Sequence, residues 1–179
     1  MKKLLAFFIL VIPLALFSDS YTTPLLQISS KLFPKILFME KGTKDRIQSS
    51  INLVIVASPS NQEAARNFSS MLLKQYPDGI NDHPIRISIV SIKEVLEMNN
   101  LHGIILMVPP DEISLRPLIK HTYDNKILTF CFDPSLLERG AIISLYIGKN
   151  IKPYLNVSAL KQTSFTFEYS FIKLSIPYE

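Results

Sequence analysis

Three short and almost uninterrupted apolar runs constrain the fold of this 179-residue chain more than any other feature of its sequence. They cover residues 51–57, 103–108 and 127–132, and a proline follows each of them within two residues. Apolar runs of this length are typical of strands that are covered on both faces in a parallel sheet. Helical patterns lie between the runs, so the sequence predicts an α/β protein in which strands and helices alternate.

The segments around these runs complete the predicted sheet. Residues 85–90 alternate apolar and polar side chains, which predicts a strand with one exposed face or at a sheet edge. Residues 141–147 and 151–155 flank a three-residue turn suited to a hairpin, and Pro153 would confine the second strand to an edge. We therefore predict a three-layer α/β sandwich whose mainly parallel sheet of five to six strands is flanked by helices and ends in a C-terminal antiparallel hairpin.

Helices are predicted on both sides of that sheet. Apolar residues recur at helical spacing between residues 22 and 39: Leu25, Ile28, Leu32 and Ile36. Pro34 should kink this helix or end it. A second helix is expected from residue 62 to about residue 76, and its sheet-facing residues would be Ala65, Phe68 and Leu72. Shorter helices are expected over residues 91–99 and 111–123, the latter with two carboxylates in its first turn.

The C-terminal tail concentrates aromatic side chains. Four of them alternate within seven residues: Phe165, Phe167, Tyr169 and Phe171. The alternation fits a strand, but Phe167 and Phe171 are also one helical turn apart, and we interpret the tail as two short helices, the first capped by Asn156. In a helix, Phe167 and Phe171 would be buried while Tyr169 points away. Tyr169 and Phe165 are candidate partner-binding residues, with ordinary core packing of the aromatics as the alternative.

The first 20 residues have the three parts of a secretory signal peptide. Lys2 and Lys3 precede fourteen uncharged residues, 4–17, and small polar residues lead to a cleavage site near Ser20. Fourteen residues fall short of the roughly 20 that cross a bilayer as a helix, although an uncleaved anchor is the alternative. The sequence predicts a signal peptide over residues 1–20 and a single exported domain over residues 21–179, located in the periplasm without stable membrane insertion after cleavage.

Composition and motifs argue against several function classes. Without the signal peptide the net charge is about +3, and Lys and Arg are not clustered as in nucleic-acid-binding proteins. The five glycines form no phosphate-binding loop, and the three histidines are dispersed. Cys131 cannot form an internal disulfide and is expected to be an inert thiol in a buried strand. The neighbouring carboxylates Asp111 and Glu112 suit a helix start. We predict no catalytic residue, no metal site and no cofactor, and therefore no enzyme.

One loop is a candidate ligand-binding site. Ser58, Ser60 and Asn61 follow a buried strand and precede a helix, the position at which α/β proteins often bind anions. Their side chains could hold a carboxylate or a phosphate. They could equally cap the following helix, which is the interpretation we favour.

The segment from Gly140 to Leu160 resembles the closing block of the YfiR family of periplasmic proteins. That block has a glycine, an apolar strand, a short turn, a second strand ending in Ile-Asn or a similar pair, and a helix. Here Leu155-Asn156 occupies the Ile-Asn place, so Gly140 and Asn156 are expected to be structural residues of the motif. Residues 25–39 are similar to the family's first helix, residues 167–178 look like its final helix, and the three apolar runs fall where its central strands fall.

The resemblance implies a dimeric α/β protein that acts in periplasmic signalling. The family's type member binds the periplasmic sensor domain of a membrane diguanylate cyclase and holds cyclic-di-GMP output low, and relief favours biofilm formation. Other members accompany membrane receptor kinases. The expected partner is therefore the sensor domain of a membrane signalling protein, with a homodimer as a further expectation. The family's disulfides and the Trp-Pro that ends its first helix are absent here, so its redox response does not carry over.

A second function class stays open. Sheets of this kind also resemble one lobe of a solute receptor, so a periplasmic small-molecule binding protein, acting as a sensor or a transport component, is the alternative. The length counts against it, because two-lobed receptors usually need about twice as many residues.

Overall fold

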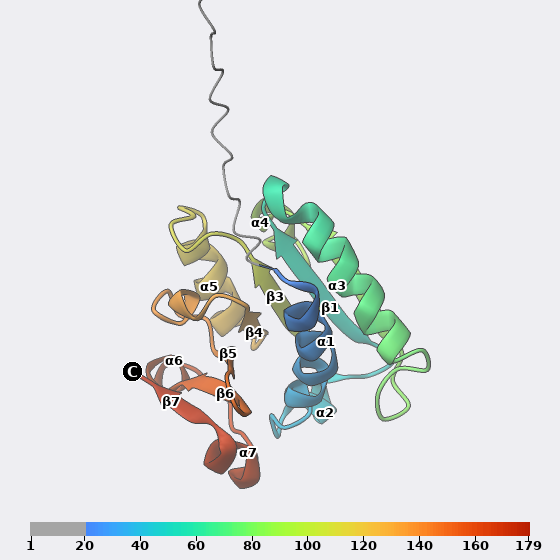
Figure 1. Ribbon diagram of the computed structural model, residues 1–179. Helices are drawn as coiled ribbons and strands as arrows, with labels where there is room; N and C mark the ends of the chain where they lie inside the picture. The colour runs from blue at the N-terminus through green and yellow to red at the C-terminus, as the bar shows by residue number, and fades with distance from the viewer. Residues whose placement is uncertain (1–20) are drawn as a thin grey trace, which may run out of the picture.

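The computed structural model describes residues 21–179, and the predicted signal peptide lies outside the described residues. The described chain forms a seven-stranded sheet in the order β2-β1-β3-β4-β5-β6-β7, with helices on both faces (Figure 1). The predicted α/β sandwich with a mainly parallel sheet is confirmed, with one strand more than expected. The strands are β1 (Ile51–Ala57), β2 (Ile85–Val90), β3 (Gly103–Met107), β4 (Leu128–Cys131), β5 (Ile143–Ile147), β6 (Ile151–Asn156) and β7 (Ile176–Tyr178).

Four parallel strands form the more deeply buried half of the sheet. β1 pairs with β2 on one side and with β3 on the other, and β3 pairs with β4. β3 and β4 are buried along their whole length and β1 at every residue except Asn52, as their apolar sequences predicted. β2 lies at the edge of the sheet, which agrees with its alternating side chains.

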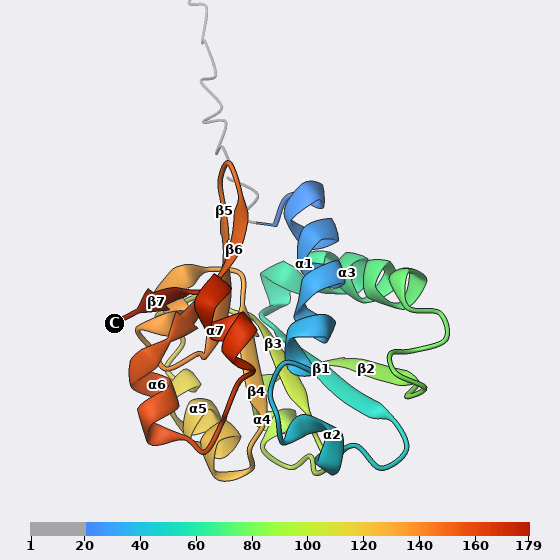
Figure 2. The same cartoon turned by 90° about the horizontal axis from the view of Figure 1, so that it is seen from below.

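Helices cover both faces of this sheet. α1 and α3 pack on one face, while α4 and α5 pack on the other (Figures 1 and 2). The predicted sheet-facing residues of α3 are all buried: Ala65, Phe68 and Leu72. The helices are α1 (Thr23–Leu37), α2 (Thr43–Arg46), α3 (Gln62–Gln75), α4 (Ile92–Val95), α5 (Leu115–Asp124), α6 (Val157–Gln162) and α7 (Tyr169–Leu174), and 3-10 turns occupy Pro59–Asn61 and Pro134–Leu137.

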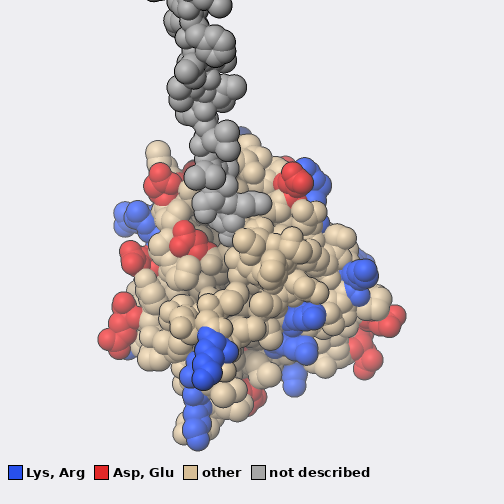
Figure 3. All heavy atoms as spheres, in the orientation of Figure 1, with Lys and Arg blue, Asp and Glu red and all other residues tan. Residues whose placement is uncertain are grey.

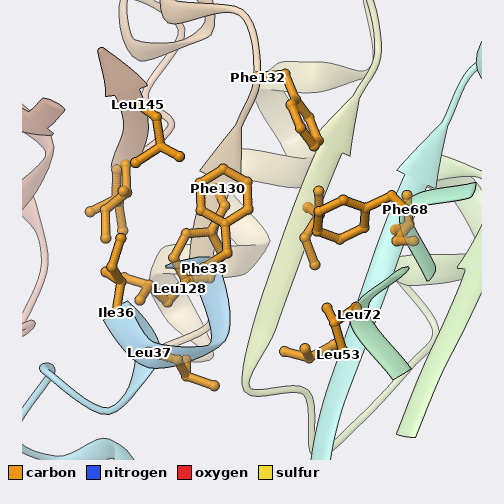
Figure 4. Packing of buried hydrophobic residues seen from close by; sticks show 14 of the residues in the cluster. Phe33, Ile36, Leu37, Leu53, Phe68, Leu72, Leu128, Phe130, Phe132 and Leu145 are labelled. Atoms are coloured by element: carbon orange, nitrogen blue, oxygen red, sulfur yellow. The ribbon is translucent and has the colours of Figure 1, made fainter. Parts of the chain in front are cut away.

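A cluster of phenylalanines fills the core beneath α1 and α3. Phe33 of α1 stacks on Phe130 of β4, with 4.9 Å between the ring centroids. Phe132 meets Phe33 edge-on at 5.6 Å and Phe68 of α3 edge-on at 5.4 Å (Figure 4). Edge-to-face and offset contacts of this kind add to the free energy gained from apolar burial. These rings therefore join both helices to the centre of the sheet.

The buried face of α1 differs from the predicted one. Its buried apolar residues are Leu26, Phe33, Ile36 and Leu37, and of the four predicted positions Leu25, Ile28 and Leu32 are only partly buried. The helix also continues past Pro34 to Leu37. Pro34 has no N–H to donate to the carbonyl of Ser30, and its ring crowds that carbonyl, so it disturbs the turn before it without ending the helix.

Two helices on the opposite face are shorter than predicted. α4 ends at Val95, and Asn100 adopts a left-handed φ of 58° before β3 begins. α5 begins at Leu115 rather than at Asp111. Glu112 lies in the preceding turn, where its Oε1 accepts a hydrogen bond from the backbone N–H of Ser114 at 3.2 Å. Its carboxylate therefore organises a turn and does not lie in a helix.

The C-terminal part of the sheet confirms the predicted hairpin and adds a strand. β5 and β6 pair antiparallel around residues 148–150. β6 is not an edge strand, because β7 pairs with it in parallel from Tyr154 to Asn156, so the edge position predicted from Pro153 is wrong. Pro153 is tolerated because it lies just outside the segment that β7 covers. The first predicted helix of the tail, α6, is confirmed, whereas the final helix expected over residues 167–178 is limited to α7, because residues 176–178 form β7.

Candidate functional site

A pocket opens at the carboxyl ends of the parallel strands, at the point where β2 and β3 lie on opposite sides of β1. The chain moves from β1 to β2 on one side and then to β3 on the other, so the loops after β1 and β3 separate and leave a crevice. We call the pocket there, of about 510 Å³, the strand-end pocket. It is lined by Tyr21, Ser60, Asn61, Val108, Pro109, Pro110, Phe132, Asp133 and Pro134.

Two of the three predicted ligand residues line this pocket, and the capping role we favoured for them is wrong. Ser60 and Asn61 are lining residues, whereas Ser58 is not. The Ser58 and Ser60 hydroxyls bond each other at 3.0 Å, and Asn61 Nδ2 donates to the carbonyl of Met107 at 2.9 Å. A 3-10 turn precedes α3, and no side chain caps either helical segment. Ligand binding by these residues stays a prediction.

The other lining residues give the pocket an apolar wall with polar groups beside it. Tyr21 meets Phe132 edge-on at 5.3 Å. Burial and the neighbouring Asp133 carboxylate raise the pKa of Tyr21 to about 12, so its hydroxyl stays protonated at neutral pH and can donate a hydrogen bond. Asp133 Oδ1 accepts hydrogen bonds from the backbone N–H and the hydroxyl of Ser135. An apolar wall beside a carboxylate suits a small molecule that has a ring and a hydrogen-bond donor group.

Gly140 and Asn156, the residues of the closing block, have structural roles in this chain. Asn156 Oδ1 accepts from the backbone N–H of Ala159 at 2.9 Å, which caps α6 as predicted. Its Nδ2 donates to the carbonyls of Leu137 and Ala141 at 2.6 and 2.9 Å. Gly140 has a φ of +102°, and a Cβ there would lie 2.8 Å from Ile119 Cγ2. A side chain at Gly140 would therefore strain the backbone and crowd Ile119, and replacing Asn156 would remove three hydrogen bonds.

The predicted partner-binding residues divide into one exposed and one buried side chain. Tyr169 is 76% exposed, whereas Phe165 is 8% exposed and packs under the Arg46 guanidinium, so it cannot serve a partner as expected. Phe167 and Phe171 are both buried as predicted, with 5.0 Å between their ring centroids, but they do not share a helix, because α7 begins at Tyr169 and Phe167 forms an isolated antiparallel β-bridge with Glu40. Sequence reasoning missed the exposed Ile172 and Leu174. A helical wheel drawn from Tyr169 would have found Ile172, three positions later.

Two buried polar clusters gave no signal in the sequence. Glu40 is 2% exposed and accepts hydrogen bonds from Thr43 Oγ1 and from Arg46 Nη2, both at 2.8 Å. His102 Nδ1 accepts from the backbone N–H of Asn52 at 3.0 Å, and this contact assigns the proton to Nε2, which lies 3.3 Å from the carbonyl of Arg46. Glu40 Oε1 also accepts a hydrogen bond from the backbone N–H of Thr166 in the C-terminal tail at 3.4 Å, so both clusters join segments far apart in the chain, which local patterns do not show.

Reactive and metal-binding groups are not gathered anywhere in the part of the chain that the structure describes. Cys131 is fully buried, and burial raises the pKa of its thiol far above the usual range, which keeps it protonated and inert. No group of three His, Cys, Asp or Glu side chains could hold a metal ion among residues 21–179. None of the described helices is long and apolar enough to cross a membrane.

Comparison with known proteins identifies similar folds only. No family model and no curated protein matches the sequence. The structure is similar to that of a conserved domain protein from Vibrio cholerae, with a TM-score of 0.58 and 13% identity over 86% of this chain and 60% of that one. It is also similar to an ABC domain from Streptococcus pneumonia in complex with L-Trp, with a TM-score of 0.55 and 11% identity over 85% of this chain and 59% of that one. The chain therefore spans about 60% of the length of these structures.

Proposed function

We propose that this protein is a periplasmic, non-catalytic regulator that binds the periplasmic sensor domain of a membrane diguanylate cyclase or histidine kinase and modulates its output. The observation that carries the proposal is that the outer surface of α7 exposes three apolar side chains around Lys173. Tyr169, Ile172 and Leu174 are 76%, 46% and 66% exposed within six residues. Single exposed apolar residues are common on protein surfaces, but neighbouring ones often mark contact sites for other proteins.

The rest of the tail holds this face in place. Phe167 and Phe171 are buried in the main core, and the backbone of Glu168 donates to the carbonyl of Met39 at 2.8 Å. A surface that is already ordered loses little conformational entropy on binding, which favours affinity. The predicted signal peptide and the closing block from Gly140 to Leu160 support the periplasmic signalling role.

The experiment uses purified periplasmic domains of the membrane cyclases and histidine kinases encoded in the same genome. We expect one of them to bind the processed protein, and we expect Tyr169→Ala to weaken that binding roughly thirty-fold or more with an unchanged melting temperature. Leu73→Ala is the matched control, because Leu73 is 42% exposed on the distant helix α3. The proposal fails if no domain binds, or if both variants weaken binding equally.

A second candidate function is small-molecule binding in the strand-end pocket. The pocket has the volume of a small-ligand site, and the similar structure from Streptococcus pneumonia is a complex with L-Trp. An amino acid could place its ammonium group near Asp133 and its side chain against the prolines and Phe132. Titration calorimetry with L-tryptophan tests this function, and Asp133→Asn should abolish the heat of binding. A ligand there could also bias the partner contact, in which case the two functions are linked.

A further inference from the structure

The outer part of the β5–β6 hairpin extends beyond the sheet as a two-stranded ribbon. In the described chain, β4 pairs with β5 only through Phe130 and Ile143, and β7 pairs only with residues 154–156 of β6. Residues 145–153 therefore pair with no strand outside the hairpin. Figure 2 shows this ribbon rising from the same side of the sheet as the start of α1. A two-stranded ribbon is marginally stable in water, so a surface that covers its apolar side chains would stabilise it.

Apolar side chains occupy the end of this ribbon. Ile147 and Ile151 are directly paired and are 42% and 43% exposed. They continue the face on which Leu145 is buried in the core beneath α1. Tyr146 lies on the opposite face, is 42% exposed and meets Tyr154 edge-on at 5.9 Å. We call Tyr146, Ile147 and Ile151 the hairpin tip.

The charged residues around the hairpin tip are basic. Between Gly140 and Asn156 the chain has two lysines, Lys149 and Lys152, and neither Asp nor Glu. α1 likewise has the exposed lysines Lys31 and Lys35 and no acidic residue. Figure 3 views the molecule from the side toward which the ribbon points. It shows Lys and Arg around a broad uncharged surface, with Asp and Glu mostly near the edges.

We propose that this face binds the surface of an anionic phospholipid membrane, with the hairpin tip among the headgroups and the lysines near the lipid phosphates. Exposed aliphatic and aromatic side chains flanked by lysines are the combination that binds reversibly to such surfaces. A protein partner of comparable charge would have to present a matching acidic patch, whereas anionic lipid supplies negative charge over the whole face. The inference goes beyond the proposed function, because it assigns a second contact that α7 does not make.

The contact would be peripheral and dependent on salt. Three side chains at the end of a ribbon reach the interfacial region but cannot span the bilayer, which agrees with the predicted lack of stable insertion. Lysines attract anionic lipid within a Debye length, so binding should weaken steeply as ionic strength rises.

A single-tryptophan variant tests the proposal directly. The chain has no Trp, so Ile147→Trp in the processed protein places a unique fluorophore at the hairpin tip. We expect its emission to shift to the blue on vesicles of phosphatidylglycerol and phosphatidylcholine in equal parts, and to be quenched by bromine-labelled lipid. Vesicles of phosphatidylcholine alone should leave the tryptophan emission unchanged. Leu73→Trp is the control, because Leu73 is equally exposed, at 42%, and lies on α3 away from the hairpin.

A charge-matched pair of double variants tests the electrostatic part. Lys149→Gln with Lys152→Gln should bind anionic vesicles roughly thirty-fold more weakly in co-sedimentation. Lys93→Gln with Lys120→Gln removes the same charge from exposed positions on α4 and α5, which cover the opposite face of the sheet, and should bind as wild type does. Tyr169→Ala should also bind vesicles normally, which separates this contact from the proposed protein contact through α7.

Three results would overturn the proposal. The first is that the tryptophan emission of the Ile147→Trp variant does not shift on anionic vesicles, or shifts equally on neutral ones. The second is an equal loss of binding in both double variants, which would mean that net charge alone attracts the protein. The third is a blue shift that appears without lipid as protein concentration rises, together with a dimer in sedimentation. In that case the hairpin tip would be a contact between two copies of the chain.

Discussion

The two halves of the sheet are built in different ways. The parallel half, β2-β1-β3-β4, consists of strands of four to seven residues paired along most of their length and covered by α1, α3, α4 and α5. The C-terminal half, β5-β6-β7 with α6 and α7, consists of elements of three to six residues. In the described chain the two halves share a single paired position between β4 and β5.

This difference in construction shows which interactions stabilise each half of the sheet. Apolar burial on both faces stabilises the parallel half, and each strand needs little else to define its position. Helices of six residues such as α6 and α7 are too short to be stable alone, so their positions depend on contacts with distant parts of the chain. Asn156 supplies one set of these long-range hydrogen bonds, and Glu40 supplies another. Five substitutions and one control test this comparison, beginning with the largest expected effect.

Removing an aromatic ring from the core beneath α1 and α3 should lower the free energy of unfolding the most. Phe33→Ala should lower the free energy of unfolding by about 3–5 kcal/mol, because Phe33 is 2% exposed and contacts three other phenylalanine rings. Urea denaturation followed by circular dichroism measures the change. Phe171 lies in the C-terminal half and is 6% exposed, so Phe171→Ala should lower the free energy of unfolding by a similar amount. We expect both variants to unfold in a single transition. Two separate transitions would show that the halves unfold independently.

Replacing Asn156 tests the polar contacts of the C-terminal half. Asn156→Ala should cost about 2–4 kcal/mol, because it removes the cap of α6 and leaves the carbonyls of Leu137 and Ala141 without their partner. The control is Ser91→Ala, which removes an exposed cap of α4 alone and should cost about 0.5–2 kcal/mol. Equal costs for the two variants would mean that the two carbonyl contacts do not stabilise the closing block.

Glu40 joins α2 to the C-terminal tail and should make this link sensitive to acid. Burial alone would raise the pKa of Glu40, but hydrogen bonds from Thr43, Gly42 and Arg46 outweigh it and lower the pKa below the ordinary 4.5. The stabilisation is therefore complete above pH 4.5 and is lost as pH falls through the lower pKa of the folded state. Glu40→Gln should cost about 1–3 kcal/mol at pH 7, measured by urea denaturation.

The pH series supplies the control for Glu40. The difference in unfolding free energy between wild type and Glu40→Gln should shrink as pH falls below 4.5, because protonation of the wild-type carboxyl removes the same interaction. A difference that stays constant down to about pH 3 would contradict the ionised state assigned to Glu40.

The smallest effect is expected at His102, which links β1 to α2 within the parallel half. Burial is the main cause that lowers the pKa of His102 below 6.5, with the positive charges of Arg46 and His83 also acting in that direction. The unfolded chain therefore takes up the proton first as pH falls. His102 contributes its full stabilisation above pH 6.5 and loses it between 6.5 and the folded-state pKa.

Glutamine can reproduce both contacts of the neutral imidazole without titrating. Its Oε1 can accept from the N–H of Asn52 and its Nε2 can donate to the carbonyl of Arg46. His102→Gln should therefore lie within about 1 kcal/mol of wild type at pH 7 and lack the wild-type loss of stability as pH falls below 6.5. Parallel pH profiles for the two proteins would contradict this assignment.

Local sequence patterns predicted the parallel half and the hairpin closely. The bounds of β1 and β2 were predicted to the residue, because apolar runs and period-two alternation depend only on neighbours in the chain. The strand β7 was missed, since three residues, Ile176-Pro177-Tyr178, carry no pattern that separates a strand from a tail. The buried face of α1 was predicted only in part, because nearly every turn of this helix has apolar residues on two sides: Ile36 is buried, but Leu25, Ile28 and Leu32 pack at the border of the core.

The candidate sites were predicted less completely than the fold. Ser60, Asn61 and Tyr169 were found from their position after a strand and from helical spacing, and the structure places them at a pocket and on an exposed helix face. The partners of Ser60 and Asn61 in the strand-end pocket come from the loops after β3 and β4, about 50 and 70 residues further along. Which loops meet is a consequence of strand order, which local patterns do not specify.

The sequence by itself determined the alternation of buried strands and helices, the turn of the hairpin and the cap at Asn156, because each depends on side chains within a few residues of one another. Only the tertiary structure decided that β7 covers β6, that Phe165 is buried beneath Arg46 while Tyr169 stays in solvent, and that the hairpin tip extends beyond the sheet. The physical reason is that burial depends on which distant segments pack together. Local propensity sets the elements, and long-range packing sets which of their faces remain free to bind.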